Sequence, residues 1–232
     1  MMSLKYILSD LLSLLFPRLC CGCGTDLYRG ESLICSACMF RLPYTDDHLY
    51  PDNKAAKQLW ARLPCNAVMS LLYFKKGARV QQLIHHLKYK GRRDLGIKLG
   101  NMIAEKLQVS PFYTGVDLIV PVPLHKSKER LRGYNQSKYI ADGIAQVLHA
   151  PVSTACLVRL KATKSQTRKG RYQRFENMQT VFSITDAFIF KNKHVLLVDD
   201  VMTTGATLEA CGMELLACNP TKLSIATVAF AE

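Results

Sequence analysis

Apolar runs alternate with amphipathic stretches over most of this chain. Short, continuous apolar runs predict buried strands at 67–74, 116–122, 194–199 and 222–230. Between them, apolar residues recur at helical spacing and predict helices at 78–90, 95–107, 134–148 and 206–217. One or two short strands are expected within 151–160, and the polar, basic stretch 161–177 predicts a loop. Strands that alternate with helices indicate an α/β fold, with a mainly parallel, twisted sheet that helices cover on both faces.

The first 64 residues follow a different pattern. Apolar residues at helical spacing within 4–15 predict an amphipathic helix that ends at Pro17 and docks on the protein, or alternatively on a membrane or partner. This helix is too short to be a transmembrane span, and no signal-peptide cleavage site follows it. We therefore expect a helix with a cysteine-rich module at 1–44, a polar linker at 45–64 and one α/β domain at 65–232.

Five of the nine cysteines lie within nineteen residues of each other, at positions 20, 21, 23, 35 and 38. Two Cys-x-x-Cys pairs of this kind bring four thiolates into the tetrahedral arrangement of a closed structural zinc site. A dense cluster with isolated cysteines elsewhere favours metal in a reducing compartment over a disulfide framework. We expect structural Zn²⁺ at Cys20, Cys23, Cys35 and Cys38. Cys21 is an alternative first ligand with poorer spacing, and free or oxidised cysteines are the alternative to a metal site.

The formal charge of +13 is concentrated in two blocks. Residues 75–98 include eight basic residues and one acid, and residues 120–175 include twelve basic residues and two acids. Basic blocks on an otherwise mildly acidic chain indicate a polyanionic partner, namely a diphosphate, a nucleic acid or an anionic membrane surface. A solvated basic face is the alternative.

The segment 195–207 (VLLVDDVMTTGAT) carries the strongest candidate for chemistry. A buried strand ends in Asp199 and Asp200, and a loop of small residues then begins a helix. Free N–H groups at a helix start attract anions, and a glycine lets the backbone approach a phosphate closely. The carboxylates would repel a phosphate, but they suit ribose hydroxyls or Mg²⁺. The segment lacks the Walker and dinucleotide-loop signatures, which excludes those two nucleotide-binding motifs.

Asp-Asp followed two residues later by Thr-Thr-Gly-x-Thr resembles the 5-phosphoribosyl-1-diphosphate (PRPP) motif of type I phosphoribosyltransferases. The resemblance implies that Asp199 and Asp200 take the catalytic position and hold the ribose diol. It implies that the 5′-phosphate binds Thr203, Thr204, Gly205, Ala206 and Thr207. In that family the loop after the preceding strand binds diphosphate together with Mg²⁺, and this loop is here Val122, Pro123, Leu124 and His125. Four cations follow this loop and suit the same ligand: Lys126, Lys128, Arg130 and Arg132.

Three further features resemble the ComF family of phosphoribosyltransferase-fold proteins. They are the segment 130–136 (RLRGYNQ), the cysteine pairs as a small zinc ribbon, and a spaced pattern of Arg159, Thr163, Gln166, Arg174, Asn177 and Phe182. The resemblance implies a cytoplasmic protein, in some cases at the inner face of the membrane, that handles single-stranded DNA during competence with a helicase partner. The expected nucleic-acid contacts are Arg130, Arg132, Arg168, Lys169 and Arg171.

Two other functions remain open from the sequence. Phosphoribosyl transfer needs positioning and charge neutralisation rather than a protein nucleophile, so an active enzyme of nucleotide or base salvage also fits. No aromatic or acidic signature names an acceptor for such an enzyme. A non-catalytic sensor, in which bound ligand orders residues 161–177, is the third hypothesis.

Overall fold

The computed structural model describes residues 17–160 and 181–231. The predicted N-terminal helix and the predicted loop at 161–177 lie outside the described residues, and with that loop lie Arg168, Lys169 and Arg171. No helix within the described ranges is both long enough and apolar enough to cross a membrane.

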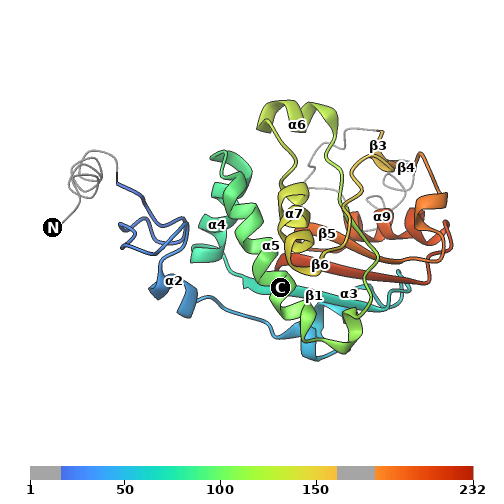
Figure 1. The fold of residues 1–232 in the computed structure, drawn as a ribbon, viewed down its shortest axis with the longest axis horizontal. Helices are drawn as coiled ribbons and strands as arrows, with labels where there is room; N and C mark the ends of the chain where they lie inside the picture. The colour runs from blue at the N-terminus through green and yellow to red at the C-terminus, as the bar shows by residue number, and fades with distance from the viewer. Residues whose placement is uncertain (1–16, 161–180, 232) are drawn as a thin grey trace.

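A four-stranded parallel sheet forms the centre of the molecule (Figure 1). The strand order is β1 (Ala67–Phe74), β6 (Lys222–Ala231), β5 (His194–Met202) and β2 (Leu118–Pro121). All three neighbouring pairs are parallel, which confirms the predicted sheet. The strand β5 continues three residues beyond its predicted end, so Asp199 and Asp200 lie within its last part rather than at its end.

Helices cover both faces of the sheet, as the alternation of strands and helices predicts. One face packs against α4 (Arg79–Tyr89), α5 (Arg93–Gln108) and α7 (Gln136–Leu148), and the other against α3 (Lys54–Leu59) and α9 (Ala206–Leu216). Along β5, Leu196 and Val198 contribute to the first core, whereas Val195 and Leu197 contribute to the second. This alternation follows from the two-residue period of a strand.

The helices α5 and α7 pack backbone to backbone at Gly100 and Gly143. A Cβ atom at Gly100 would lie 2.1 Å from the Ile140 carbonyl oxygen, and one at Gly143 would lie 2.2 Å from that of Ile97. Only glycine permits this approach, because any side chain would overlap the facing helix. The close contact fixes α7, whose first turn carries Ser137 of the site described below, against α5.

The stretch 45–64, interpreted as a linker from its polar residues, requires a correction. It contains a 3-10 helix η1 (Asp47–Leu49) and the helix α3. Four apolar side chains of this stretch are buried in the core beneath the sheet: Ala55, Ala56, Leu59 and Leu63. The polar composition was misleading because Asn53 is a helix cap, whose side-chain oxygen accepts from the Ala56 amide at 2.8 Å. The division of the chain into three parts stays a prediction.

Several short elements complete the described chain. The helix α6 (Lys126–Arg132) buries no residue, which explains why no apolar period predicted it. The strands β3 (Leu157–Arg159) and β4 (Phe182–Ile184) form a small antiparallel pair above α9, and η2 (Pro111–Tyr113) and η3 (Phe188–Phe190) are single 3-10 turns. The helix α2 (Ser36–Phe40) belongs to the cysteine module, which lies at one end of the molecule beside α4 (Figure 1).

Candidate functional site

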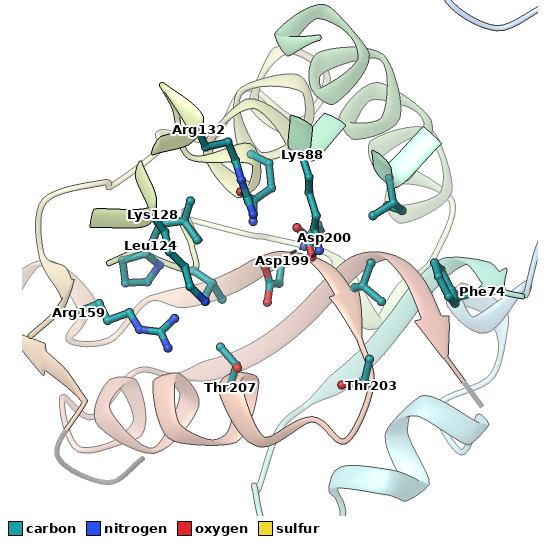
Figure 2. A pocket seen from close by; sticks show the side chains of 15 residues that line it. Phe74, Lys88, Leu124, Lys128, Arg132, Arg159, Asp199, Asp200, Thr203 and Thr207 are labelled. Carbon is teal, nitrogen blue, oxygen red and sulfur yellow. Dashed lines mark hydrogen bonds and ion pairs between the residues drawn. The ribbon is translucent and has the colours of Figure 1, made fainter. Parts of the chain in front are cut away.

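An open pocket of about 550 Å³ lies at the carboxyl end of the sheet (Figure 2). Its lining comes from elements that are far apart in the sequence. The polar lining residues are Lys88 of α4, Lys128 and Arg132 of α6, Gln136 of α7, Arg159 of β3, Asp199 and Asp200 of β5, and Thr203 and Thr207 of the following loop and helix. In open parallel sheets ligands bind at this edge, so the pocket is the candidate ligand site.

The two carboxylates at the centre of the pocket are buried and have different partners. Asp199 Oδ1 accepts from Ser137 Oγ at 2.9 Å and from the Asp200 amide at 2.8 Å. Asp200 Oδ1 forms an ion pair with Lys88 Nζ at 2.9 Å. Burial and then repulsion from Asp200 raise the pKa of Asp199 to about 7. A full negative charge on Asp199 is therefore unfavourable unless a proton or a cation offsets it.

The two oxygens of Asp200 have different surroundings. Asp200 Oδ2 is buried and makes no hydrogen bond within the residues that the structure describes. A buried carboxylate oxygen without a donor is unfavourable, and a ligand, an ion or a water that supplies a partner would stabilise it. Carboxylate oxygens are ligands that Mg²⁺ prefers, and they also accept from ribose hydroxyls. Asp199 and Asp200 thus fit both groups that the sequence led us to expect there.

Four cationic side chains converge on the same pocket, against two carboxylates. Figure 2 shows Lys128 and Arg132 on one side of the acids, and Thr203 and Thr207 on the other. The pKa of Lys128 is lowered by partial loss of hydration, and further by its cationic neighbours, beginning with Arg159. Neighbouring cations repel one another, so an anionic ligand in the pocket would stabilise their arrangement.

The predicted phosphate loop lies at the edge of this pocket. A smaller hollow of about 40 Å³ is lined by Thr203, Thr204, Gly205, Ala206 and Thr207. Gly205 caps α9 with a φ of +75°, a left-handed conformation that side chains disfavour. The hollow therefore combines the amino end of a helix with small hydroxyl side chains, as a phosphate subsite requires.

The structure separates the members of the predicted diphosphate loop. Val122, Pro123 and Leu124 line the pocket, and the Val122 carbonyl accepts from Asn135 Nδ2 at 3.0 Å. His125 is not among the lining residues, because its Nδ1 accepts from the Ser127 amide at 3.2 Å and caps α6. A ligand role for His125 stays a prediction, while its structural role as a cap is evident.

The two predicted nucleic-acid contacts within the described chain have different surroundings. Arg130 of α6 is exposed and is not among the residues that line the pocket, whereas Arg132 lines it and donates to Gln136. The Arg132 guanidinium also lies 5.4 Å from the ring centre of Tyr89, which is 66% exposed. Arg132 thus connects the pocket to an aromatic residue on the surface.

Sequence reasoning missed two contacts to the acidic pair. Lys88 belongs to one of the basic blocks, but only the packing of α4 beside β5 brings it to Asp200. Ser137 lies sixty-two positions before Asp199, in the first turn of α7. Neither residue carries a local signal, because both contacts depend on which helix packs beside the end of β5.

The cysteine module brings together the four thiols that the spacing indicated. The Sγ atoms of Cys20, Cys23, Cys35 and Cys38 all lie within 4.8 Å of one another. The Cys23 and Cys35 sulfurs are 3.7 Å apart, and tetrahedral zinc with Zn–S bonds of about 2.3 Å requires roughly 3.8 Å. Cys21 is buried outside this group, so Cys20 is the member from the first pair. The group could hold zinc.

The chain is similar to one family model and to several known proteins. The family model described as phosphoribosyl transferase domain matches residues 136–232. The chain is 28% identical over 211 residues to the DNA utilization protein YhgH of Escherichia coli K12, covering 86% of this chain and 91% of that protein. It is 34% identical over 93 residues to competence protein F of Haemophilus influenzae, covering 40% of this chain and 41% of that protein. Among solved structures, a glutamine PRPP amidotransferase from B. subtilis superposes with a TM-score of 0.43 at 19% identity, covering 62% of this chain and 30% of that one.

The parallel sheet, the acidic pair followed by a small-residue loop, and the domain match define a phosphoribosyltransferase-fold protein. Its N-terminal four-cysteine cluster is consistent with a zinc ribbon. The chain is a homologue of competence protein F and of DNA utilization protein YhgH, which confirms the resemblance to the ComF family.

Proposed function

We propose that this chain binds PRPP with Mg²⁺ in the pocket and handles single-stranded DNA during DNA uptake. The observation that carries the proposal is the convergence of four cations and two carboxylates beside a small-residue phosphate loop. The names of its homologues, which refer to competence and to DNA utilization, support the DNA part. By the ComF resemblance, its place is the cytoplasm, including the inner face of the membrane, with a helicase as partner.

Each part of PRPP has a matching part of the pocket. The 5′-phosphate suits the hollow at residues 203–207, and the ribose diol suits Asp199 and Asp200. The diphosphate suits Lys128, Arg132 and the loop from Val122 to Leu124, on the other side of the acids (Figure 2). Mg²⁺, when bound, would neutralise diphosphate charge, and the two carboxylates are the residues that would hold it.

Calorimetric titration with PRPP and MgCl₂ tests the pocket. Asp199→Asn/Asp200→Asn keeps the shape of the acidic pair but removes its charge, and we expect PRPP affinity to fall by about a hundredfold. The matched control is Asp46→Asn/Asp52→Asn, which removes two exposed carboxylates elsewhere and should change affinity less than twofold. Equal binding by wild type and Asp199→Asn/Asp200→Asn would overturn the ligand assignment.

The DNA part of the proposal is supported by a strip of alternating aromatic and cationic side chains beside the pocket. The Arg132 guanidinium lies 5.4 Å from the ring centre of the exposed Tyr89, and the Arg93 guanidinium lies 5.6 Å from that of the half-buried Tyr139. Lys138 lies 5.1 Å from the Tyr139 ring. Aromatic rings stack with bases and the cations contact phosphates, which is how single strands are bound without sequence preference.

Fluorescence anisotropy with a labelled oligothymidine tests the strip. We expect affinity to fall steeply as salt increases, and Tyr89→Ala to weaken binding by about tenfold. Tyr50→Ala removes a ring that is 58% exposed and lies outside the strip, and it is the control. Salt-independent binding, or equal losses in the two variants, would contradict the assignment of the strip.

Phosphoribosyl transfer to a small acceptor is the second candidate function. The lining of the pocket includes the apolar side chains of Phe74, Ile84 and Val201, which suit a flat acceptor. An enzyme would release diphosphate from PRPP only when the acceptor is present. Diphosphate release across a panel of bases measures this directly, and its absence with tight PRPP binding would favour a non-catalytic sensor.

We also propose that the cysteine group holds structural zinc. Backbone amides support it, since the Gly22 and Cys35 amides donate to Cys20 Sγ at 3.3 Å and 3.2 Å. Amide donors of this kind stabilise thiolates, which is the form of cysteine that binds zinc.

A further inference from the structure

Two side chains from the N-terminal part of the chain hold the phosphate loop from outside the pocket. Gln58 Nε2 donates to the Thr203 carbonyl at 2.6 Å. Arg62 Nη2 donates to the Thr204 carbonyl at 2.9 Å. Gln58 lies in α3 and Arg62 just after it, and neither residue lines the pocket or the smaller hollow. The two contacts cross more than 140 positions of sequence, so only the tertiary structure creates them.

These two contacts determine where the next amides point. In a trans peptide the C=O and the following N–H lie on opposite sides of the bond. When Gln58 holds the Thr203 carbonyl and Arg62 holds the Thr204 carbonyl, the N–H groups of Thr204 and Gly205 are turned away from α3. That side carries the hollow lined by residues 203–207, where the phosphate would bind.

Arg62 is itself fixed in place. Its Nη1 forms an ion pair with Glu209 Oε2 at 2.7 Å, and the Glu209 side chain is only 3% exposed. The same guanidinium donates to the Gln58 carbonyl, so it joins α3, the loop and α9. Leu59 packs beneath the loop so closely that a Cβ atom at Gly205 would lie 2.7 Å from its Cδ2. The loop therefore rests on a rigid support rather than on solvent.

We propose that Arg62, assisted by Gln58, is a positioning residue for the 5′-phosphate subsite. It orients the Thr204 and Gly205 amides toward the phosphate, and it does so without touching the ligand. This inference rests on the proposed function, because it assigns a role within the same PRPP site. It also gives the segment 45–64 a function in ligand binding that its polar sequence does not indicate.

Three ligands separate this role from general stabilisation. Ribose 5-phosphate and PRPP both carry the 5′-phosphate, whereas inorganic diphosphate does not. We expect Arg62→Met to weaken binding of the first two by about tenfold, the effect of misplacing one or two hydrogen bonds to a charged group. Diphosphate affinity should stay within twofold, because its subsite lies on the other side of the acids. Isothermal titration with MgCl₂ present measures all three.

Two further variants complete the experiment. Lys57→Met removes an exposed cation from α3 and should leave all three affinities unchanged. This variant is the control for the loss of a positive charge near the loop without loss of a contact to it. Gln58→Ala removes only the contact to Thr203 and should weaken the two 5′-phosphate ligands by about threefold.

The outcomes distinguish this inference from the proposed function. Unchanged ribose 5-phosphate affinity in Arg62→Met, or equal losses for all three ligands, would overturn the positioning role. A wild-type protein that binds none of the three would instead overturn the PRPP site itself.

Discussion

The cysteine cluster and the pocket differ in how much of the chain is needed to build them. The four thiols come from nineteen consecutive residues, and local turns with N–H···S contacts bring them together. The pocket takes Lys88 from α4, Lys128 from α6, Arg159 from β3 and Asp200 from β5. The comparison shows that a metal site can be specified by spacing, whereas this anion site depends on helices and strands meeting at one sheet edge.

The two regions also differ in their electrostatics. Four thiolates around Zn²⁺ would form a closed tetrahedral group, in which the metal offsets part of the negative charge of the sulfurs. The pocket instead buries two adjacent carboxylates among cations, and the raised pKa of Asp199 reflects the free-energy cost of doing so. A site of this kind is less favourable without its ligand, which is typical of binding sites.

The largest expected effect concerns the cluster. In Cys35→Ser/Cys38→Ser we expect loss of the single zinc ion and unfolding of residues 17–44, because zinc contributes about 10–16 kcal/mol in small zinc-binding peptides. Metal analysis and hydrogen exchange measure both effects. PRPP affinity should change less than threefold if the two regions are independent.

Cys21→Ser is the control for this prediction. Its side chain is buried but outside the cluster, so the zinc content should stay near one per chain. A folded, metal-free wild-type protein would contradict the zinc site, and a large loss of PRPP binding in the double variant would contradict the independence of the regions.

The second effect concerns the pocket. Lys88→Met leaves Asp200 buried without its ion-pair partner, and we expect the free energy of unfolding to fall by about 2 kcal/mol. Urea denaturation measures it. Lys88→Met/Asp200→Asn should recover most of the loss, because it removes the unpaired charge.

Lys90→Met provides the comparison, since Lys90 is an exposed lysine just after α4. A loss in Lys90→Met as large as that in Lys88→Met would mean that general charge, rather than the contact with Asp200, explains the result.

The smallest effect is a pH dependence from Asp199. Its pKa of about 7 in the folded protein is above the ordinary aspartate value of 3.8, so the folded state holds a proton that the unfolded chain has lost. The stability from this group is therefore lost as pH rises through 7, by about 1 kcal/mol between pH 6.5 and pH 8. Buried histidines change the pH dependence of stability in the opposite sense. The measurement is therefore the difference between the wild-type protein and Asp199→Asn in the free energy of unfolding at each pH. Parallel curves for the two proteins would contradict the raised pKa.

The sequence predicted the strands and helices that have a clear apolar period better than the short helices that lack one. The strand β1 has the predicted bounds, and α4, α5, α7 and α9 differ by one or two residues at most of their ends. Helices without a local apolar period were missed, as α6 and α3 show. In α3 the buried residues are too few to form a period, and α6 buries none.

For the candidate site, the loop at residues 203–207 and the acidic pair were recognisable because their chemistry depends on adjacent residues. The cysteine group was recognisable for the same reason. The residues that contact the acidic pair and the loop from elsewhere in the chain were not recognisable. Lys88, Ser137 and Arg62 contact Asp200, Asp199 and Thr204, which lie far from them in the sequence.

The sequence by itself determined the parallel sheet, the loop that suits a phosphate and the spacing of the four thiols, because each is set by local patterns of burial, turn chemistry or ligand distance. Only the tertiary structure decided that the cysteine cluster includes Cys20 rather than Cys21. It also decided that Lys88 pairs with Asp200, and that residues 45–64 support the phosphate loop. These decisions depend on how helices pack on the two faces of the sheet. Packing is a sum of many weak contacts between distant residues, and no short segment of the chain records it.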